Sequence, residues 1–154
     1  MMHFTSGISD AVNAQAAVEA ACRQVREQLA GAPCHLACVF ASPIYRTSWP
    51  PLLAYLHEQL TPQVLIGCSG SGVIGGGQEL EWVPAISIVG ATLPGVKLFP
   101  FAVTPDELGL SEAGGFWVDK IGAAPDAHPN FVVCADPYTC DTLKLLTELN
   151  DTYR

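Results

Sequence analysis

Basic residues are scarce in this 154-residue sequence: seven lysines and arginines stand against fifteen acids, for a formal net charge of −8. Nucleic-acid binding depends on clustered Lys and Arg that neutralise phosphates, and anionic membrane surfaces attract proteins through the same residues. The basic residues are scattered and form no stripe: Arg23, Arg26, Arg46, Lys97, Lys120, Lys144 and Arg154. We therefore expect neither a nucleic-acid partner nor a membrane partner.

Long apolar runs are also missing. No run approaches the ~18 residues of a membrane-spanning helix, and the longest, at 36–41 and 64–68, have the length of a strand. The first residues lack the basic start and the apolar stretch of a secretory signal peptide. These absences predict a cytoplasmic protein.

Charged residues make up only 14% of the chain, whereas 49% of the residues are hydrophobic. Intrinsic disorder requires the opposite balance, so the composition indicates a folded protein. A chain of this length has the size of one domain and can bury a sizeable core. The low charged fraction also suggests that another domain or subunit covers part of the surface.

Clustered metal ligands are absent as well. The six cysteines follow neither a secreted disulfide framework nor the spacing of a zinc site. They are Cys22, Cys34, Cys38, Cys68, Cys134 and Cys140. We expect reduced, mostly structural thiols, no metal site and no cofactor.

In the first half of the chain, apolar periodicity predicts helices that alternate with buried strands. Ser9 and Asp10 resemble an N-cap for a helix that extends to about residue 30. Near-continuous apolar runs predict buried strands at 35–42 and 63–68. A helix that begins after Ser48 is expected between these strands.

The second half predicts a hairpin with strands at 85–93 and 96–103, and a capped helix start at Thr104. The stretch to about residue 129 is expected to be mostly loop with a short helix, and residues 130–135 are expected to form a buried strand. A last helix begins near Thr139, with one apolar face: Leu143, Leu146, Leu149 and Tyr153. Together these elements predict an α/β fold, a mixed sheet with helices packed on it.

A glycine- and serine-rich loop follows the second buried strand. Its small residues leave backbone N–H groups accessible to a carboxylate or another small polar group. The same composition suits a simple flexible turn. The predicted ligand-binding residues of the loop are Gly67, Cys68, Ser69, Gly70, Ser71 and Gly72.

Two other interpretations of this loop, as a dinucleotide-binding motif and as a nucleophile elbow, have less support from the sequence. Residues 70–75 match the dinucleotide fingerprint G-x-G-x-x-G, but the glycines that follow oppose the helix that the fingerprint needs. The loop also resembles a nucleophile elbow, in which Cys68 or Ser69 would need a base, and no histidine has an obvious acid partner. We therefore expect a domain without catalytic activity. The alternative is an enzyme in which Cys68 is the nucleophile.

A second candidate segment, 136–139, follows the predicted strand at 130–135. Ligand crevices of α/β sheets lie outside the carboxyl ends of strands. Asp136 and Thr139 are therefore predicted to face the loop across such a crevice. A turn followed by a helix cap is the other explanation of these residues.

Four segments resemble one known family. They are LACVFASP at 36–43, VLIGCSGSG at 64–72, AISIV at 85–89 and FVVCADPYT at 131–139. This pattern resembles the N-terminal half of the FIST domain. One departure is Val73, which stands where the family more often has Glu, so that Glu79 is the nearest acid in the sequence.

The resemblance implies that residues 1–154 form the N-terminal half of a larger two-part domain whose C-terminal half is absent. The last helix agrees with a fragment, because it reaches Arg154 without a glycine cap or a following strand. The implied function is a cytoplasmic signal-input domain that binds a small molecule such as an amino acid. The implied partners are the C-terminal FIST half or a signalling output domain, and a ligand-free interaction scaffold is a further alternative.

Overall fold

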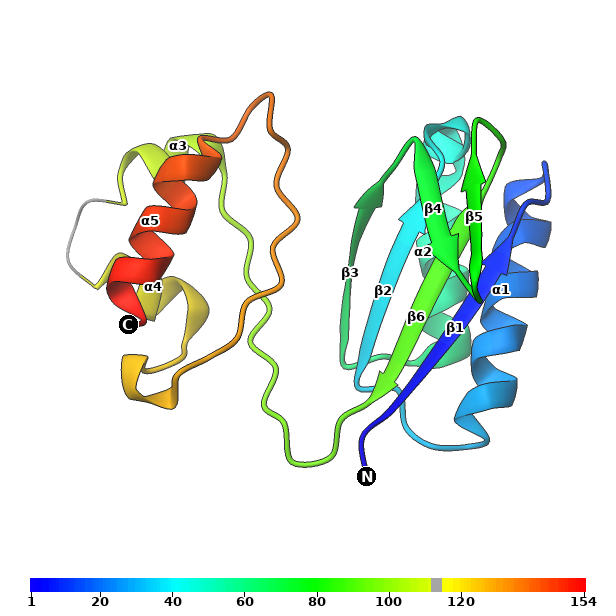
Figure 1. The fold of residues 1–154 in the computed structure, drawn as a ribbon, viewed down its shortest axis with the longest axis horizontal. Coiled ribbons are helices and arrows are strands. Elements are labelled where there is room, and N and C mark those ends of the chain that lie inside the picture. Colours follow the sequence, from blue (N-terminus) through cyan, green and yellow to red (C-terminus); the bar gives the residue numbers. More distant parts are fainter. Residues whose placement is uncertain (112–114) are drawn as a thin grey trace. The chain divides into compact units, whose positions relative to one another are not determined.

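A computed structural model describes residues 1–111 and 115–154 (Figure 1). It contains two compact units, Met1–Val96 and Lys97–Arg154, and each unit has an apolar core of its own. No helix in the two described ranges is long and apolar enough to cross a membrane.

The first unit is built on a four-stranded sheet in the order β1-β6-β2-β3. Its strands are β1 (His3–Ser9), β2 (Leu36–Ala41), β3 (Val64–Ser69) and β6 (Ile86–Thr92). Strand β6 runs antiparallel to both of its neighbours, whereas β2 and β3 are parallel. This mixed sheet, with helices packed on it, confirms the predicted α/β fold class.

Two helices cover one face of the sheet, α1 (Ala14–Leu29) and α2 (Trp49–Leu60), the latter preceded by a 3-10 helix, η1 (Pro43–Ser48). The predicted cap of the first helix was wrong. Asn13 is the N-cap, and its side-chain oxygen accepts a hydrogen bond from the Ala16 backbone N–H at 3.0 Å. Ser9 is instead the last residue of β1, a strand that was not predicted from the sequence.

A short hairpin lies on the other face of the sheet, formed by β4 (Gly72–Gly75) and β5 (Gln78–Glu81). Gly76 and Gly77 form its two-residue turn with φ angles of 55° and 77°, as the turns that best fit a hairpin's twist require. Buried Val73 of β4 packs with Ile8 of β1. The sequence predicted a glycine- and serine-rich loop up to Gly72 and did not predict this hairpin.

The second unit contains α3 (Pro105–Gly109), α4 (Phe116–Ile121), the 3-10 turn η2 (Pro125–Ala127) and α5 (Thr142–Thr152). The helix start at Thr104 is confirmed by a capping box.

The predicted apolar face of the last helix was partly wrong. Leu143 and Leu146 are 77% and 56% exposed, whereas Leu145 and Leu149 enter the core. The cause is register: residues 145, 149 and 153 repeat every four positions and therefore share one side of the helix.

The predicted strands at 96–103 and 130–135 are also wrong. Both segments are irregular, and neither takes part in a strand pair among the described residues. Val132 is 69% exposed, so the second segment is not buried either. Phe101 and Phe131 connect the segments through an edge-to-face ring contact, with centroids 6.3 Å apart. High β-propensity produces a strand only where a partner strand is within reach.

Glu107 connects α3 to α4. Its carboxylate accepts hydrogen bonds from the Thr104 N–H at 2.8 Å and from the Lys120 ammonium at 2.7 Å. The hydrogen bond from Lys120, followed by that from Thr104, lowers the pKa of Glu107 from 4.5 to about 2. A lowered pKa in the folded state means that the ionised carboxylate stabilises the fold above pH 4.5, and that this contribution disappears as the pH falls through about 2.

Glu107→Gln is therefore expected to lower the melting temperature of the second unit at neutral pH. The difference in melting temperature between the variant and the wild type should become smaller as the pH falls from 4.5 towards 2. Thermal unfolding followed by circular dichroism across this range measures the effect. Glu58→Gln, at an exposed position of α2, is the matched control. A difference that stays constant with pH would contradict this role of the charge.

Candidate functional site

The glycine- and serine-rich loop begins at one particular end of the sheet. Strands β1 and β2 are both antiparallel to β6, and β3 is parallel to β2, so the carboxyl ends of all three strands share this end (Figure 1). Strand β3 stops there at Ser69. Open α/β sheets bind ligands outside the carboxyl ends of their parallel strands. The position of the loop thus fits a ligand site.

Backbone hydrogen bonds decide which amides of the loop are available. The Val64 N–H donates to the carbonyl of His35, the residue before β2, and the Gly70 N–H donates to the carbonyl of Ala41, the last residue of β2, each at 3.0 Å. Alternate residues of a strand direct their N–H groups to the same side. The amides of Gly67 and Ser69 therefore point away from β2, towards the outer edge of β3, and both residues are exposed.

Gly67 pairs with Val39 of β2 and lies close against it. A Cβ atom at this position would lie 1.8 Å from the Val39 carbonyl oxygen and 2.9 Å from the Val39 Cγ1 atom. No side chain fits in that space. The absence of a Cβ atom is therefore what lets the start of the loop lie against β2.

The last part of the loop belongs to the hairpin, where Gly72 pairs with Glu81 of β5. The Glu81 side chain lies over Gly72, with its Cγ 3.0 Å and its Oε1 3.3 Å from the position of a Cβ on that glycine. The structure thus brings Glu81, rather than Glu79, beside the loop. Glu79 pairs with Ile74 farther along the hairpin. The two-glycine turn at 76–77 is the sequence signal that could have fixed this register.

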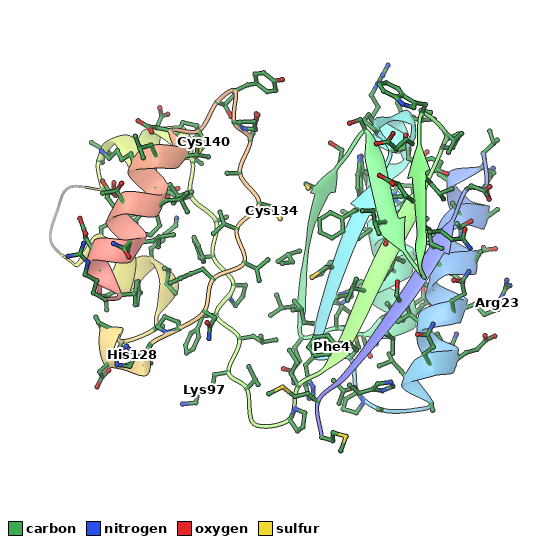
Figure 2. All side chains as sticks on the ribbon, in the orientation of Figure 1. Phe4, Arg23, Lys97, His128, Cys134 and Cys140 are labelled. Carbon is green, nitrogen blue, oxygen red and sulfur yellow. The ribbon has the colours of Figure 1, made fainter. Side chains whose placement is uncertain are left out.

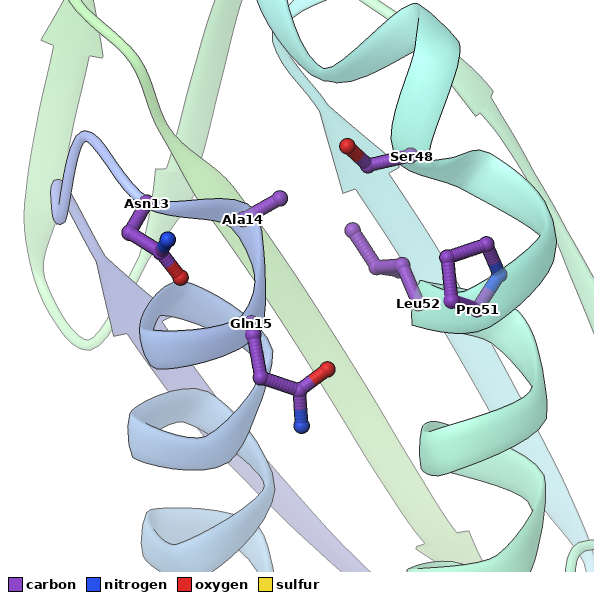
Figure 3. A pocket seen from close by; sticks show the side chains of 6 residues that line it. All are labelled: Asn13, Ala14, Gln15, Ser48, Pro51 and Leu52. Carbon is purple, nitrogen blue, oxygen red and sulfur yellow. The ribbon is translucent and has the colours of Figure 1, made fainter.

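A small cavity at the same end of the sheet was not predicted from the sequence. It has a volume of about 170 Å³ and lies between the beginnings of α1 and α2, on the helix-covered side of the sheet (Figure 3). Its lining residues are Asn13, Ala14, Gln15, Ser48, Pro51 and Leu52. Ligand pockets usually measure about 300–1,000 Å³, so this cavity suits only an ion or a very small molecule.

A larger and more open cavity of about 600 Å³ lies at the other end of the helices. It is bordered by the last turns of α1 and α2 and by the connection at 31–34. Its charged groups include Arg26, whose guanidinium donates to the Gln59 side-chain oxygen at 2.7 Å. Neither this cavity nor the smaller one includes a residue of the glycine- and serine-rich loop.

Asp136 and Thr139 belong to the second unit, and the structure brings them together in one turn. The Asp136 carboxylate accepts hydrogen bonds from the Tyr138 N–H at 3.0 Å and from the Thr139 hydroxyl at 2.9 Å. Both of its oxygens are therefore occupied by the turn itself. Asp141 then caps α5, where the sequence analysis had placed the helix start near Thr139.

The histidines of the first unit lie away from Cys68. His3 begins β1, and His35 precedes β2, where its Nδ1 accepts a hydrogen bond from the Leu93 N–H at 2.7 Å. His57 lies in the last turn of α2, next to the amino end of β3. All three are at the end of the sheet opposite to the loop. Among the described residues, no group of three or more His, Cys, Asp and Glu could hold a metal ion.

The cysteines differ in accessibility. Burial raises the pKa of Cys22 from 9.0 to about 12, and burial also raises that of Cys34. Cys68 and Cys134 are exposed, and Figure 2 shows Cys134 in the segment before α5.

This contrast predicts selective alkylation. The higher pKa lowers the thiolate fraction of Cys22 about a thousandfold, so iodoacetamide at mildly alkaline pH should modify Cys68 and Cys134 in the folded protein but not Cys22. Peptide mass spectrometry before and after unfolding in urea checks this result. Equal labelling of Cys22 and Cys134 in the folded state would contradict the burial of Cys22.

The fold and the loop define a class: a mixed-sheet α/β domain with a small-residue loop at the carboxyl ends of its parallel strands. Residues 35–154 match the FIST N domain, and the chain belongs to this family. This finding confirms the resemblance that the four sequence segments indicated.

The chain is similar to uncharacterized mycobacterial proteins. It is 29% identical to one from Mycobacterium tuberculosis strain H37Rv over 149 residues, which are 97% of this chain and 37% of that protein. A protein from Mycobacterium bovis is 29% identical over 136 residues, 88% of this chain and 33% of the relative. The chain thus spans about a third of the length of these relatives. No solved structure matches it.

Proposed function

We propose that this chain is a signal-input domain that binds a small molecule and has no catalytic activity of its own. The observation that carries the proposal is the outward direction of the Gly67 and Ser69 amides at the carboxyl end of β3. Free amides in a loop of small residues can donate hydrogen bonds to an anionic group of a ligand. We also propose that the domain is cytoplasmic and that it is one part of a larger sensory protein.

An amino acid fits the charges around the loop. Its carboxylate can accept hydrogen bonds from the two amides, and its ammonium group can pair with Glu81 beside Gly72. A ligand with carboxylates alone would be repelled by Glu81. The predicted contribution of Asp136 and Thr139 to the site stays a prediction.

Binding is favoured over catalysis by the position of the histidines of the first unit. A nucleophilic Cys68 or Ser69 needs a base within hydrogen-bond reach. His3, His35 and His57 lie at the opposite end of the sheet. For the complete protein, we propose that the remaining length seen in the relatives contains the C-terminal FIST half or an output domain.

Isothermal titration calorimetry tests the proposal directly. The complete natural protein is titrated with each of the common amino acids and with small carboxylates such as acetate and succinate. We expect saturable binding of at least one amino acid and weaker or no binding of the carboxylates that lack an amine. The absence of saturable heat with every compound would contradict the proposed function.

A further inference from the structure

The β4–β5 hairpin is fixed to the sheet through its inner face. Val73 is buried, and Leu80 packs against the same small core. The Ser87 hydroxyl donates to the Ile74 carbonyl at 2.7 Å, and the Gly76 N–H donates to the Ser6 hydroxyl at 3.1 Å. The hairpin therefore presents its outer face from a fixed position.

That outer face presents Ile74, and the chain directly after β5 presents further exposed apolar side chains. Ile74 is 71% exposed, and Trp82, directly after β5, is 87% exposed; Val83 is 39% exposed. Trp82 also has a left-handed backbone, with φ at 61°, a conformation that is uncommon for bulky residues. Exposed tryptophans are rare on protein surfaces but common at the centres of interfaces.

The same face carries negative charge. The strand register places Glu79 opposite Ile74, and Glu81 opposite Gly72, so both carboxylates share the outer face with Ile74. Within the described part of the chain, no ion pair involves either carboxylate. The sequence from 47 to 96 contains no Lys or Arg that could neutralise them.

Among the residues that the structure describes, strand β5 pairs with β4 alone, so its second edge can accept another strand. We propose that this hairpin is a docking surface for an extended segment of a partner protein with Arg or Lys at alternate positions. Alternate side chains of an added strand lie about 6.5–7 Å apart, which matches the spacing of Glu79 and Glu81 along β5. An arginine at the end of the segment can stack on the Trp82 indole.

The outer face of the hairpin suits an extended segment, because the strand edge and the two carboxylates follow the length of β5. This inference does not depend on the proposed amino-acid site.

The test uses the complete protein and a fluorescently labelled peptide, acetyl-Thr-Arg-Val-Arg-Val-Arg-amide, with the version that has Glu for Arg as the control probe. Fluorescence anisotropy should show binding of the Arg peptide alone. Raising the ionic strength from about 0.02 to 0.15 M should weaken binding, because the charges lie at the surface. We expect Trp82→Ala and the double variant Glu79→Gln/Glu81→Gln each to weaken it about tenfold or more. Glu58→Gln should leave it unchanged.

Three results would overturn the proposal. The first is that both peptides bind with equal affinity, or that neither peptide binds. The second is wild-type affinity in the hairpin variants. The third is self-association of the protein in sedimentation experiments that Trp82→Ala abolishes, which would assign the surface to a second copy of the chain. Thermal unfolding of each variant shows whether weaker binding comes from the changed side chains or from an unfolded protein.

Discussion

Gly67→Ala is expected to lower the free energy of unfolding of the first unit by about 3 kcal/mol, at the upper end of the usual cost of overpacking. The new methyl group would lie 1.8 Å from the Val39 carbonyl oxygen, which belongs to the backbone of β2. A backbone atom cannot move aside as a flexible side chain can. The β2–β3 pairing must therefore separate locally, and the start of the loop moves with it. Urea unfolding followed by circular dichroism measures the loss.

Gly109→Ala is the matched control for this substitution. A Cβ atom at position 109 has no neighbour within 4 Å among the described residues, so we expect the added methyl group to be accommodated. We expect a change within about 1 kcal/mol, because alanine also favours the helical backbone. If Gly67→Ala were as mild as Gly109→Ala, the close approach of β3 to Val39 would be wrong.

Ser69→Pro is expected to weaken the binding of the amino acid identified by calorimetry about tenfold or more. Loss of a hydrogen bond to a charged group costs about 1.5–3 kcal/mol, and proline removes the outward amide that the proposal assigns to the ligand. The hydrogen bond from Gly70 to the Ala41 carbonyl does not involve this amide. Proline is tolerated on edge strands where the N–H faces outward. Calorimetry on the wild type and the variant measures the change.

Ser69→Ala separates the amide from the hydroxyl, because it removes only the side-chain oxygen. We expect it to bind the amino acid with nearly wild-type affinity. Equal losses in Ser69→Ala and Ser69→Pro would assign the contact to the hydroxyl. Undiminished binding in Ser69→Pro, with the fold intact, would remove this amide from the site.

Glu81 takes part in both proposals, so each ligand should affect the binding of the other. Its carboxylate lies beside Gly72 and on the outer face of the hairpin. An ammonium group paired with Glu81 would reduce the negative charge available to a basic partner segment. The amino acid and the Arg peptide should therefore compete, and anisotropy measured at saturating amino acid should show weaker peptide binding.

The main strands and helices of the first unit could be predicted because burial leaves a clear sequence pattern. Strands β2 and β3 are near-continuous apolar runs, and proline or glycine stands near their ends. Strand β1 could not be recognised, since His3, Thr5, Ser6 and Gly7 carry no such signal. It exists because its backbone pairs with β6 along seven residues.

The errors in the second unit have a related cause. The segments 96–103 and 130–135 contain the aromatic and β-branched residues typical of strands, but strand formation depends on a partner that local sequence does not encode. The short spacing of leucines in α5 allowed more than one apolar face. Packing in the core of the second unit, which includes Leu108 of α3 and Trp117 and Ile121 of α4, decides that Leu145 and Leu149 are buried.

The candidate site was predicted in composition but not in geometry. Small residues after a buried strand indicated the loop, and the structure places it at the carboxyl end of β3. The proximity of Glu81 depends on the hairpin register, and the small cavity depends on how α1 and α2 begin side by side. Both arise from pairings between distant residues, which a single sequence does not show.

The most direct test of the account is an amide NMR titration of the complete ¹⁵N-labelled protein with the amino acid that binds in calorimetry. The account predicts that the backbone amide signals of Gly67 and Ser69 shift strongly and saturably, together with those near Glu81. If these signals stay in place while amides elsewhere shift, the ligand binds at another site, and the loop at the end of β3 is only a turn.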